Sequence, residues 1–554
     1  MSISTPVGTP YAERATSLVA RADQDRWGSV GPSLYETARV LSAAPWLPGE
    51  PRRITYLLEQ QAPDGSWGEG PLPYRLLPTL SAVEAALAVL RRGTTSAEVT
   101  GRLTAAANTG LGVLRALPPV CPWPDTAAAE ILVPSLVAKI NEKLDSLTTG
   151  ENTPDPGGPR LPDPGGPRLP DPGGPRLPDP GGPRLPVPGG FHAWAPARVA
   201  RRYAPAGSLP VKFHHTFEGI DSYIPPSLVP DTEGLLGSSP AATAARATRQ
   251  PATTAQAITD LTAVAQRYGG LFPEAAPLRV VERLWVAAAL ARAHLPAAAL
   301  PTVRGWAEEI YDPQGVRGAP GLMTDADDTA MAVLVASLVG LPYDPAPLDL
   351  FHNGSHYDCY IGEDTGSVTA NAHALQALVS HLRHRPTAEH THGPRAAKLC
   401  DWLIGRQQPE GHWSDKWHAS PYYATARSVT ALTQYGGHHA SRAARSAAAW
   451  TTDTQRADGS WGVWGGTAEE TAYAVKILLN ATTPTPRRTR ALHLAETYLH
   501  TTSHPGHQHP ALWHDKTLYA PTAVIEAEVL TAQEMLRAHR AAACTQADAE
   551  RTDA

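Results

Sequence analysis

The chain has 554 residues, of which 42% are hydrophobic and 18% charged, so it carries enough apolar side chains for a large core and is not wholly disordered. Its formal net charge of -6 leaves no overall basic excess for binding nucleic acid. No uninterrupted apolar run reaches the roughly 18 residues of a membrane-spanning helix. Four scattered cysteines without a CxxC pair, and an N-terminus without a signal-peptide pattern, predict a reduced, cytoplasmic protein.

In chain order, the apolar pattern predicts one helix after another. Segments rich in Ala and Leu at helical spacing cover residues 79–92, 280–293, 329–339, 370–382 and 467–479. Clusters of Gly, Pro and Asp separate them, and no comparable set of alternating strands occurs in the sequence. The sequence therefore predicts an all-α protein.

One low-complexity insertion interrupts this pattern. Residues 154–185 are four copies of PDPGGPRL, and a decayed fifth copy ends at Gly190. Three prolines and two glycines in every eight residues remove amide donors and disfavour any regular helix or strand. We expect residues 154–190 to form a flexible surface loop, either a tolerated expansion or a ligand for a proline-binding module.

A second repeat has wider spacing. Residues 61–67, 407–413 and 455–461 all fit the pattern Q-x3-G-x-W. A Gln side chain can bond backbone groups at the end of a helix, Gly permits a turn, and Trp packs against neighbouring helices. Three matches predict repeated helical hairpins that close into a barrel of helices.

The third motif is a cluster of carboxylates. Asp325, Asp327 and Asp328 stand directly before the apolar segment 331–339. Such a cluster can simply cap a helix and oppose its dipole. If it faces an apolar cavity instead, the three carboxylates cannot all ionise cheaply, and one of them keeps a proton at neutral pH. The motif thus predicts either a capped helix or a buried acid.

The DxDD cluster and the three Q-x3-G-x-W motifs together resemble the class II terpene cyclases, above all the bacterial class II diterpene cyclases that make copalyl-type diphosphates. Further similar segments cover nearly the whole chain except the insertion, among them 215–219, 239–244, 415–423 and 512–519. The resemblance implies two α-barrel (α/α toroid) domains in the βγ arrangement, with the active site between them. On this basis we expect a β domain of residues 1–47 and 295–540, an inserted γ domain of residues 48–294, and a disordered tail at 541–554.

The resemblance also implies the chemistry. Family members protonate the terminal alkene of an isoprenoid diphosphate, and ring closure follows while the diphosphate is kept. Asp327 takes the position of the proton donor, with Asp325 and Asp328 as its electrostatic and hydrogen-bonding partners. His373 stands where relatives keep a group that hydrogen-bonds the acid, and Asn371 of the same segment joins the catalytic set. His373 also suits an ordinary core position.

The terminating base stays open at this stage. In plant relatives that make the ent product, a histidine in the segment matched by His215 pairs with an asparagine. Glu274 stands at the asparagine position here, so the base and the stereochemistry of the product are undetermined.

Substrate and metal contacts follow from the same resemblance. Aromatic rings can stabilise a cation, and positive charge must meet the diphosphate; only seven lysines occur in the chain. Mg²⁺ is the implied cofactor and needs few protein carboxylates when phosphate oxygens are present. Each ring also suits a core position, and each lysine a solvated face. The predicted substrate-binding residues are Trp285, Lys416, Trp417, Tyr422, Lys516 and Tyr519, with Tyr423 and Trp513 as further aromatic candidates, and the predicted metal residues are Asp125 and Glu130.

The function expected from the resemblance is cyclisation of geranylgeranyl diphosphate to a bicyclic copalyl or labdane-type diphosphate. Alternatives are a drimenyl-type cyclase acting on farnesyl diphosphate and a squalene-type triterpene cyclase. Two hypotheses from other functional classes are a helical barrel without catalytic activity and a zinc prenyltransferase subunit. Because the sequence lacks a DDxxD motif, we expect a separate class I terpene synthase to consume the product; the sequence does not give the oligomeric state.

Overall fold

The computed structural model describes residues 10–118, 121–149, 184–230, 234–341, 343–363, 365–480, 485–502 and 509–552. Most of the octapeptide array, and with it the prediction of a flexible loop, lies outside these ranges. The last part of the predicted loop is different: Leu185 is buried, and its backbone N–H and carbonyl both bond the side chain of Asn141, at 2.8 and 3.0 Å. The end of the fourth copy is therefore docked on α6 (Ala129–Thr149) rather than flexible.

Helices make up most of the described chain, as the periodicity of the apolar residues predicts, and its two strands have two residues each. All five predicted helical segments are confirmed, with shifts of a few residues at their ends. The α-helices and strands are α1 Pro10–Gln24, α2 Leu34–Ala43, α3 Glu50–Glu59, α4 Leu76–Arg92, α5 Ala97–Arg115, α6 Ala129–Thr149, α7 Ala195–Tyr203, α8 Pro240–Arg249, α9 Thr254–Arg267, α10 Arg279–Ala291, α11 Leu300–Ile310, α12 Ala326–Leu338, α13 Val368–His384, α14 Glu389–Gly405, α15 Pro421–Tyr435, α16 His438–Asp453, α17 Ala468–Asn480, α18 Pro486–Thr502, β1 Trp513–His514, β2 Leu518–Tyr519 and α19 Thr522–Thr552.

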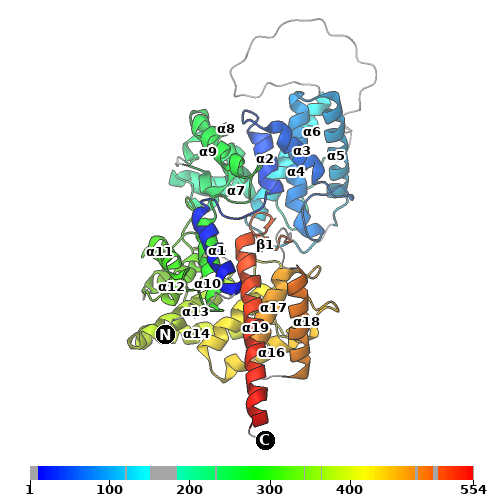
Figure 1. Cartoon of the computed structure of the whole chain (residues 1–554). Helices are drawn as coiled ribbons and strands as arrows, with labels where there is room; N and C mark the ends of the chain where they lie inside the picture. The colour runs from blue at the N-terminus through cyan, green and yellow to red at the C-terminus, as the bar shows by residue number, and fades with distance from the viewer. Residues whose placement is uncertain are drawn as a thin grey trace.

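The helices fall into two groups, one above the other in Figure 1. Helices α2 to α9 form the upper group, and α1 joins α10 to α19 in the lower group. Helix α2 packs on α4 and α8, whereas α10 packs on α1, α12 and α19. The predicted domain boundaries at residues 47 and 294 are therefore displaced: α2 belongs to the inserted γ group and α10 to the β group. The predicted disordered tail is also wrong, because α19 continues to Thr552.

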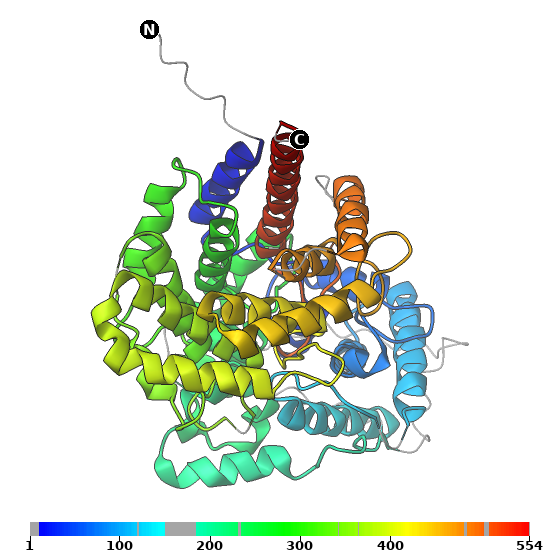
Figure 2. The same cartoon turned by 90° about the horizontal axis from the view of Figure 1, so that it is seen from below.

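The lower group is a closed double ring of helices. Going round the inner ring, α10 packs on α12, α12 on α13, α13 on α15, α15 on α17, α17 on α19, and α19 returns to α10. Helices α11, α14, α16 and α18 pack against this ring from outside. Figure 2 shows α1 and α19, from the two ends of the chain, side by side. This is an α/α barrel, and its inner helices are buried on most of their faces, α12 nearly all round.

The three Q-x3-G-x-W motifs fold in the same way. Each Gln side chain donates to the carbonyl of its own Gly and to a carbonyl of the second α-helix after the motif, at 2.7–3.0 Å. Each Trp is fully buried and donates its indole N–H to a carbonyl at the end of the preceding helix, at 2.7–2.8 Å. The motif thus ties one hairpin to the next, and it occurs in both groups, as its repeated spacing predicts.

The short β1–β2 hairpin lies at the junction of the two groups in Figure 1. Its turn carries Asp515 and Lys516, and the N–H of Ala127 in the γ group donates to the carbonyl of Asp515 at 2.9 Å. Charged side chains of the β group are thereby placed against the γ group. Among the described residues, no helix combines the length and apolarity needed to cross a membrane.

Candidate active site

The carboxylate cluster sits at the start of an inner barrel helix. Asp325 caps α12, its Oδ1 accepting from the backbone N–H of Asp328 at 2.7 Å. Asp327 and Asp328 therefore occupy the first turn. A Cβ at Gly318 would lie 2.7 Å from Oδ2 of Asp328, so only glycine lets the preceding loop close over this carboxyl. The cluster combines the helix cap and the buried acid that the sequence left as alternatives.

Burial sets the protonation of this cluster. It raises the pKa of Asp325 to about 6, the charge of Asp327 adding to the effect. Burial and the charge of Asp325 raise the pKa of Asp328 well above its usual range. Oδ1 of Asp328 has no hydrogen-bond partner among the described residues, as expected for a carboxyl that remains neutral. The three aspartates thus share at least one proton at neutral pH.

These shifts predict that the free energy of unfolding falls as pH rises. The unfolded chain releases the proton near pH 4, whereas the folded chain keeps it, so the folded state binds more protons above that pH. Between pH 4 and 7 we expect the wild-type protein to lose on the order of 1–3 kcal/mol relative to Asp328→Asn, whose side chain stays neutral. Urea unfolding of both proteins across this range tests the difference, and parallel curves would contradict it.

His373 of α13 holds the predicted donor. Its Nδ1 lies 2.6 Å from Oδ1 of Asp327, and the ring is fully buried. Edge-to-face contact with Trp285, at 5.5 Å between ring centroids, fixes the imidazole from another side. Asp327 keeps 16% of its side-chain surface exposed, so its second oxygen is open to an incoming group. The carboxyl is positioned through one oxygen and available through the other.

We therefore expect His373→Asn to reduce kcat by about 10–100-fold, the value of one hydrogen bond to a charged group. KM should change little, because the imidazole is buried behind the acid. A purely structural role would lower the melting temperature without changing the pH dependence of kcat. The measurement is therefore the pH profile of kcat together with thermal unfolding, and an unchanged profile would contradict the positioning role.

Aromatic rings gather beside the acid. Trp285 donates its indole N–H to the hydroxyl of Tyr423 at 3.0 Å, and the charge of Asp327 helps burial to raise the pKa of Tyr423. Burial and the charges of Asp515, Glu274 and Asp328 raise the pKa of Tyr519, as does neighbouring Tyr423. Tyr519, a residue of β2, therefore lies on the side of the hairpin near the acid cluster. Trp285 and Tyr519 are both close to Tyr423.

Tyr422 and Asn371, both predicted as site residues, do not contact the acid cluster. The ring of Tyr422 packs on Trp450 of the outer helix α16, at 4.7 Å between centroids, so this side of α15 faces away from Asp327. Tyr423, one position along, carries the role assigned to it. Asn371 is fully buried, and its amide bonds the backbone of Tyr357 and Ser367 at 2.8 Å. It anchors a loop to α13 and does not contact the acid.

The surroundings of Lys516 do not fit its predicted role in substrate binding. Its ammonium is fully buried, 2.6 Å from Glu36, 2.9 Å from Glu218 and 2.7 Å from the hydroxyl of Ser239. Burial lowers its pKa, but the two carboxylates outweigh this effect and raise it. Lys516 is thus an internal link between the hairpin and the γ group, with no donor left for a diphosphate.

Lys416, unlike Lys516, is only partly buried. Its ammonium pairs with Glu363, donates to the carbonyl of Thr365 at 3.0 Å and lies 5.4 Å above the ring of Trp417. The side chain keeps 13% of its surface exposed. It also stands over the ring of Tyr360, whose pKa rises to about 12 through burial and the nearby carboxylates of Glu363, Glu130 and Asp125. Lys416, Asp125 and Glu130 therefore all lie in the neighbourhood of Tyr360.

Glu363 and Lys212, two further charged residues of this region, were not predicted from the sequence. Glu363 is the ion-pair partner of Lys416. Lys212 of the γ group lies 3.9 Å from the place where a side chain on Gly362 would begin. Being one of only seven lysines and lying next to the family-like segment 215–219, Lys212 could have been found. Among the described residues, no three His, Cys, Asp or Glu side chains come together closely enough to hold a metal by themselves.

His215 of the γ group contacts the turn of the β1–β2 hairpin. Its Nδ1 lies 2.7 Å from the carbonyl of Gly237, and its Nε2 lies 3.0 and 3.1 Å from the two oxygens of Asp515. Gly237 has φ +55°, and a Cβ there would come within 2.4 Å of the backbone of His215. The close approach that makes this hydrogen bond thus depends on glycine.

Glu274, at the position where plant relatives have asparagine, does not contact His215. It is buried with 1% of its surface exposed, and it accepts from the hydroxyl of Ser33 at 2.5 Å. It also accepts from the N–H and hydroxyl of Thr517, at 2.6 and 2.9 Å. Burial and the charge of Asp515 raise its pKa to about 7.

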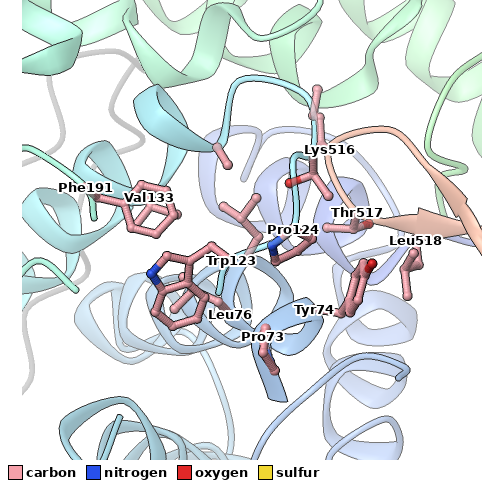
Figure 3. Close-up of a pocket in the computed structure, with 13 residues that line it drawn as sticks. Pro73, Tyr74, Leu76, Trp123, Pro124, Val133, Phe191, Lys516, Thr517 and Leu518 are labelled. Atoms are coloured by element: carbon pink, nitrogen blue, oxygen red, sulfur yellow. The ribbon is translucent and has the colours of Figure 1, made fainter. Parts of the chain in front are cut away.

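A separate small pocket lies on the γ side of the hairpin. In Figure 3, Lys516, Thr517 and Leu518 stand on one side of it, and Trp123 and Phe191 on the other. Tyr74 and Pro73 complete its lining. The three aspartates and the rings beside them are absent from its lining, so it is distinct from the candidate active site.

Known proteins share both the sequence and the fold of this chain. Residues 358–498 match the squalene-hopene cyclase C-terminal domain family. The copalyl diphosphate synthase of Streptomyces anulatus is 66% identical, covering 96% of this chain and 93% of the relative. The labda-7,13-dienyl diphosphate synthase of Streptomyces clavuligerus is 46% identical, covering 96% and 94%.

Among solved structures, the ent-copalyl diphosphate synthase from Streptomyces platensis superposes with a TM-score of 0.83 at 37% identity, covering 95% of this chain and 99% of that one. This likeness spans both helical groups and the DxDD helix between residues 326 and 338. The buried acid, the double ring of helices and relatives of this identity lead to one conclusion: the chain belongs to the bacterial class II diterpene cyclases, which are isomerases that start from a protonated carbon–carbon double bond.

Proposed function

We propose that this enzyme cyclises geranylgeranyl diphosphate to a bicyclic copalyl or labdane-type diphosphate and keeps the diphosphate. The observation that carries the proposal is the Asp327 carboxyl, bonded by His373 at 2.6 Å within a cluster that shares a proton. An alkene is a very weak base, so its proton must come from a positioned acid in a water-poor site. The full-length similarity to copalyl and labdadienyl diphosphate synthases supports the same reaction.

In this mechanism Asp327 donates through the oxygen that His373 leaves free. Once the proton has left, Asp327 is a carboxylate close to the developing carbocation, and the buried Asp328 beside it stays neutral. Trp285, Tyr423 and Tyr519 present rings to the cation, each worth about 0.5–2 kcal/mol. Trp285 is fixed by its hydrogen bond to Tyr423, so these rings are preorganised before substrate binds.

The diphosphate would bind near Lys416 and Lys212. Asp125 and Glu130 are both exposed there, and two carboxylates fit Mg²⁺ when diphosphate oxygens and waters supply its other ligands. Bound Mg²⁺ would neutralise diphosphate charge. The lysines fix the polar end of the substrate, so that its hydrocarbon tail reaches toward Asp327.

The test is incubation of the purified protein and Mg²⁺ with geranylgeranyl diphosphate, farnesyl diphosphate or squalene, followed by phosphatase treatment and mass spectrometry. A bicyclic C20 alcohol from the first substrate is the expected result. Preference for farnesyl diphosphate or squalene would instead support the drimenyl or triterpene alternative. No cyclised product from any of the three would overturn the enzyme assignment.

The proposal extends to the cellular context. The product keeps its allylic diphosphate, so a class I terpene synthase that ionises this group is the expected next enzyme. A cytoplasmic location fits free thiols and a water-soluble diphosphate substrate.

A further inference from the structure

The end of the reaction needs a proton acceptor, and the His215 side chain cannot serve as one. A carbonyl oxygen only accepts, so Nδ1 must donate its proton to Gly237. Nε2 faces both oxygens of Asp515, and with that carboxylate ionised it must donate as well. Burial lowers the pKa of His215, but the charge of Asp515 outweighs it and the pKa is raised. His215 is thus an imidazolium with no free lone pair.

Four carboxylates surround this imidazolium and Lys516, and their exposure separates them. Three are sealed: Glu36 exposes none of its side chain, Glu218 exposes 5% and Glu274 has 1% of its residue surface exposed. Asp515 keeps 20% of its side-chain surface exposed although it lies deep in the protein. Of the four, Asp515 therefore has the most side-chain surface that a substrate could contact.

Asp515 is also kept ionised. Burial raises its pKa, but the charge and hydrogen bond of His215, together with the charge of Lys516, lower it below the usual value. Tyr519 of β2 is close enough to both Asp515 and Asp328 for their charges to raise its pKa. Asp328 of the acid cluster and Asp515 therefore both lie near one tyrosine ring.

We propose that Asp515 is the catalytic base that ends the cyclisation, with His215 as its positioning residue. Ring closure leaves a tertiary carbocation, and a carbon next to it loses a proton. The C–H bond breaks, its electron pair becomes the new C=C bond, and an O–H bond forms on Asp515. Asp327 gave one proton and Asp515 receives one, so the reaction is an isomerisation. Water equilibrates both carboxyls after the product leaves.

A strong base is not required for this step. A carbocation with an adjacent C–H is an extremely strong acid, so any ionised carboxylate in contact accepts the proton. Position therefore decides which C–H is lost and hence which double-bond isomer forms. A depressed pKa of Asp515 is compatible with this role, because it ensures that the carboxylate is ionised when the cation forms.

The inference rests on the proposed function, and Asp515→Asn tests it. The variant keeps the volume of the side chain and one acceptor oxygen for His215, but it removes the charge that accepts a proton. We expect substrate consumption to fall less than 10-fold, while the share of the native bicyclic alkene falls at least 10-fold. Hydroxylated bicyclic diphosphate, from water capture of the cation, or an isomeric alkene replaces it. Both are resolved by mass spectrometry after phosphatase treatment.

Glu274→Gln is the matched control, since it alters a carboxylate of the same cluster that has almost no exposed surface. It should leave the product composition unchanged in whatever turnover remains. A native product from folded Asp515→Asn would overturn the proposal, and so would a product change in Glu274→Gln alone. If Asp515→Asn does not fold, His215→Gln is the second test: it should shift the product in the same direction, and an unchanged product would overturn the proposal. Failure of the wild-type protein to cyclise any substrate would instead overturn the proposed function.

Discussion

Asp327→Asn is expected to abolish cyclisation of geranylgeranyl diphosphate, reducing kcat by about 10³-fold or more, as expected when a general acid is removed. The amide cannot give up a proton to an alkene, while its size and its hydrogen bond to His373 are preserved. The measurement is formation of cyclised alcohol after phosphatase treatment, with thermal unfolding recorded on the same sample.

The fold should survive this change, because Asp327 keeps part of its side chain exposed and caps no helix. The control is Asp401→Asn, an exposed carboxyl on the outer helix α14, which should retain full activity. Retained cyclisation in folded Asp327→Asn would show that another member of the cluster, Asp325 or Asp328, delivers the proton.

Lys516→Met is expected to lower the free energy of unfolding by about 3–5 kcal/mol, the usual effect of removing one partner of a buried ion pair. The change leaves Glu36 and Glu218 buried without their common cation, since Lys516 is fully enclosed between them. Urea unfolding measures the loss. Replacing both glutamates by Gln in the same protein should recover part of the stability.

The outcome also separates the two roles considered for this lysine. If Lys516 bound diphosphate, Lys516→Met would raise KM and leave the free energy of unfolding unchanged. Lys398→Met, on an exposed position of α14, is the control and should affect neither. Lys416→Met is expected to raise KM and to cost less stability than Lys516→Met, because the partly exposed Lys416 pairs with one buried carboxylate, Glu363, whereas Lys516 pairs with two.

Several features could be predicted from the sequence because they depend on local spacing. The Q-x3-G-x-W motifs needed only Gln, Gly and Trp at fixed distances, and all three form the same bonds. The helical segments followed from the periodicity of Ala and Leu. Asp327 and His373 were matched through motifs, and the structure places them 2.6 Å apart.

Other assignments failed where adjacent residues have opposite surroundings. Tyr422 and Tyr423 differ by about 100° around one helix, and only packing shows that Tyr423 faces Trp285 while Tyr422 faces Trp450. Lys416 and Lys516 both lie in family-like segments. Lys416 nevertheless keeps part of its side chain exposed, whereas Lys516 is enclosed between two buried glutamates. Asp515 was overlooked beside Lys516 for the same reason.

The sequence alone determined the helices, the barrel repeats and the presence of an acid triplet before an apolar helix, because each depends on residues that are close together in the chain. Only the tertiary structure decided which carboxyls are neutral, which cations are paired and where the two helical groups divide. These properties depend on burial and on charges from distant parts of the chain: His215 and Asp515 are 300 positions apart, and Lys516 and Glu36 are 480 apart. The ionisation of a buried group is set by such neighbours, and local spacing does not reveal them.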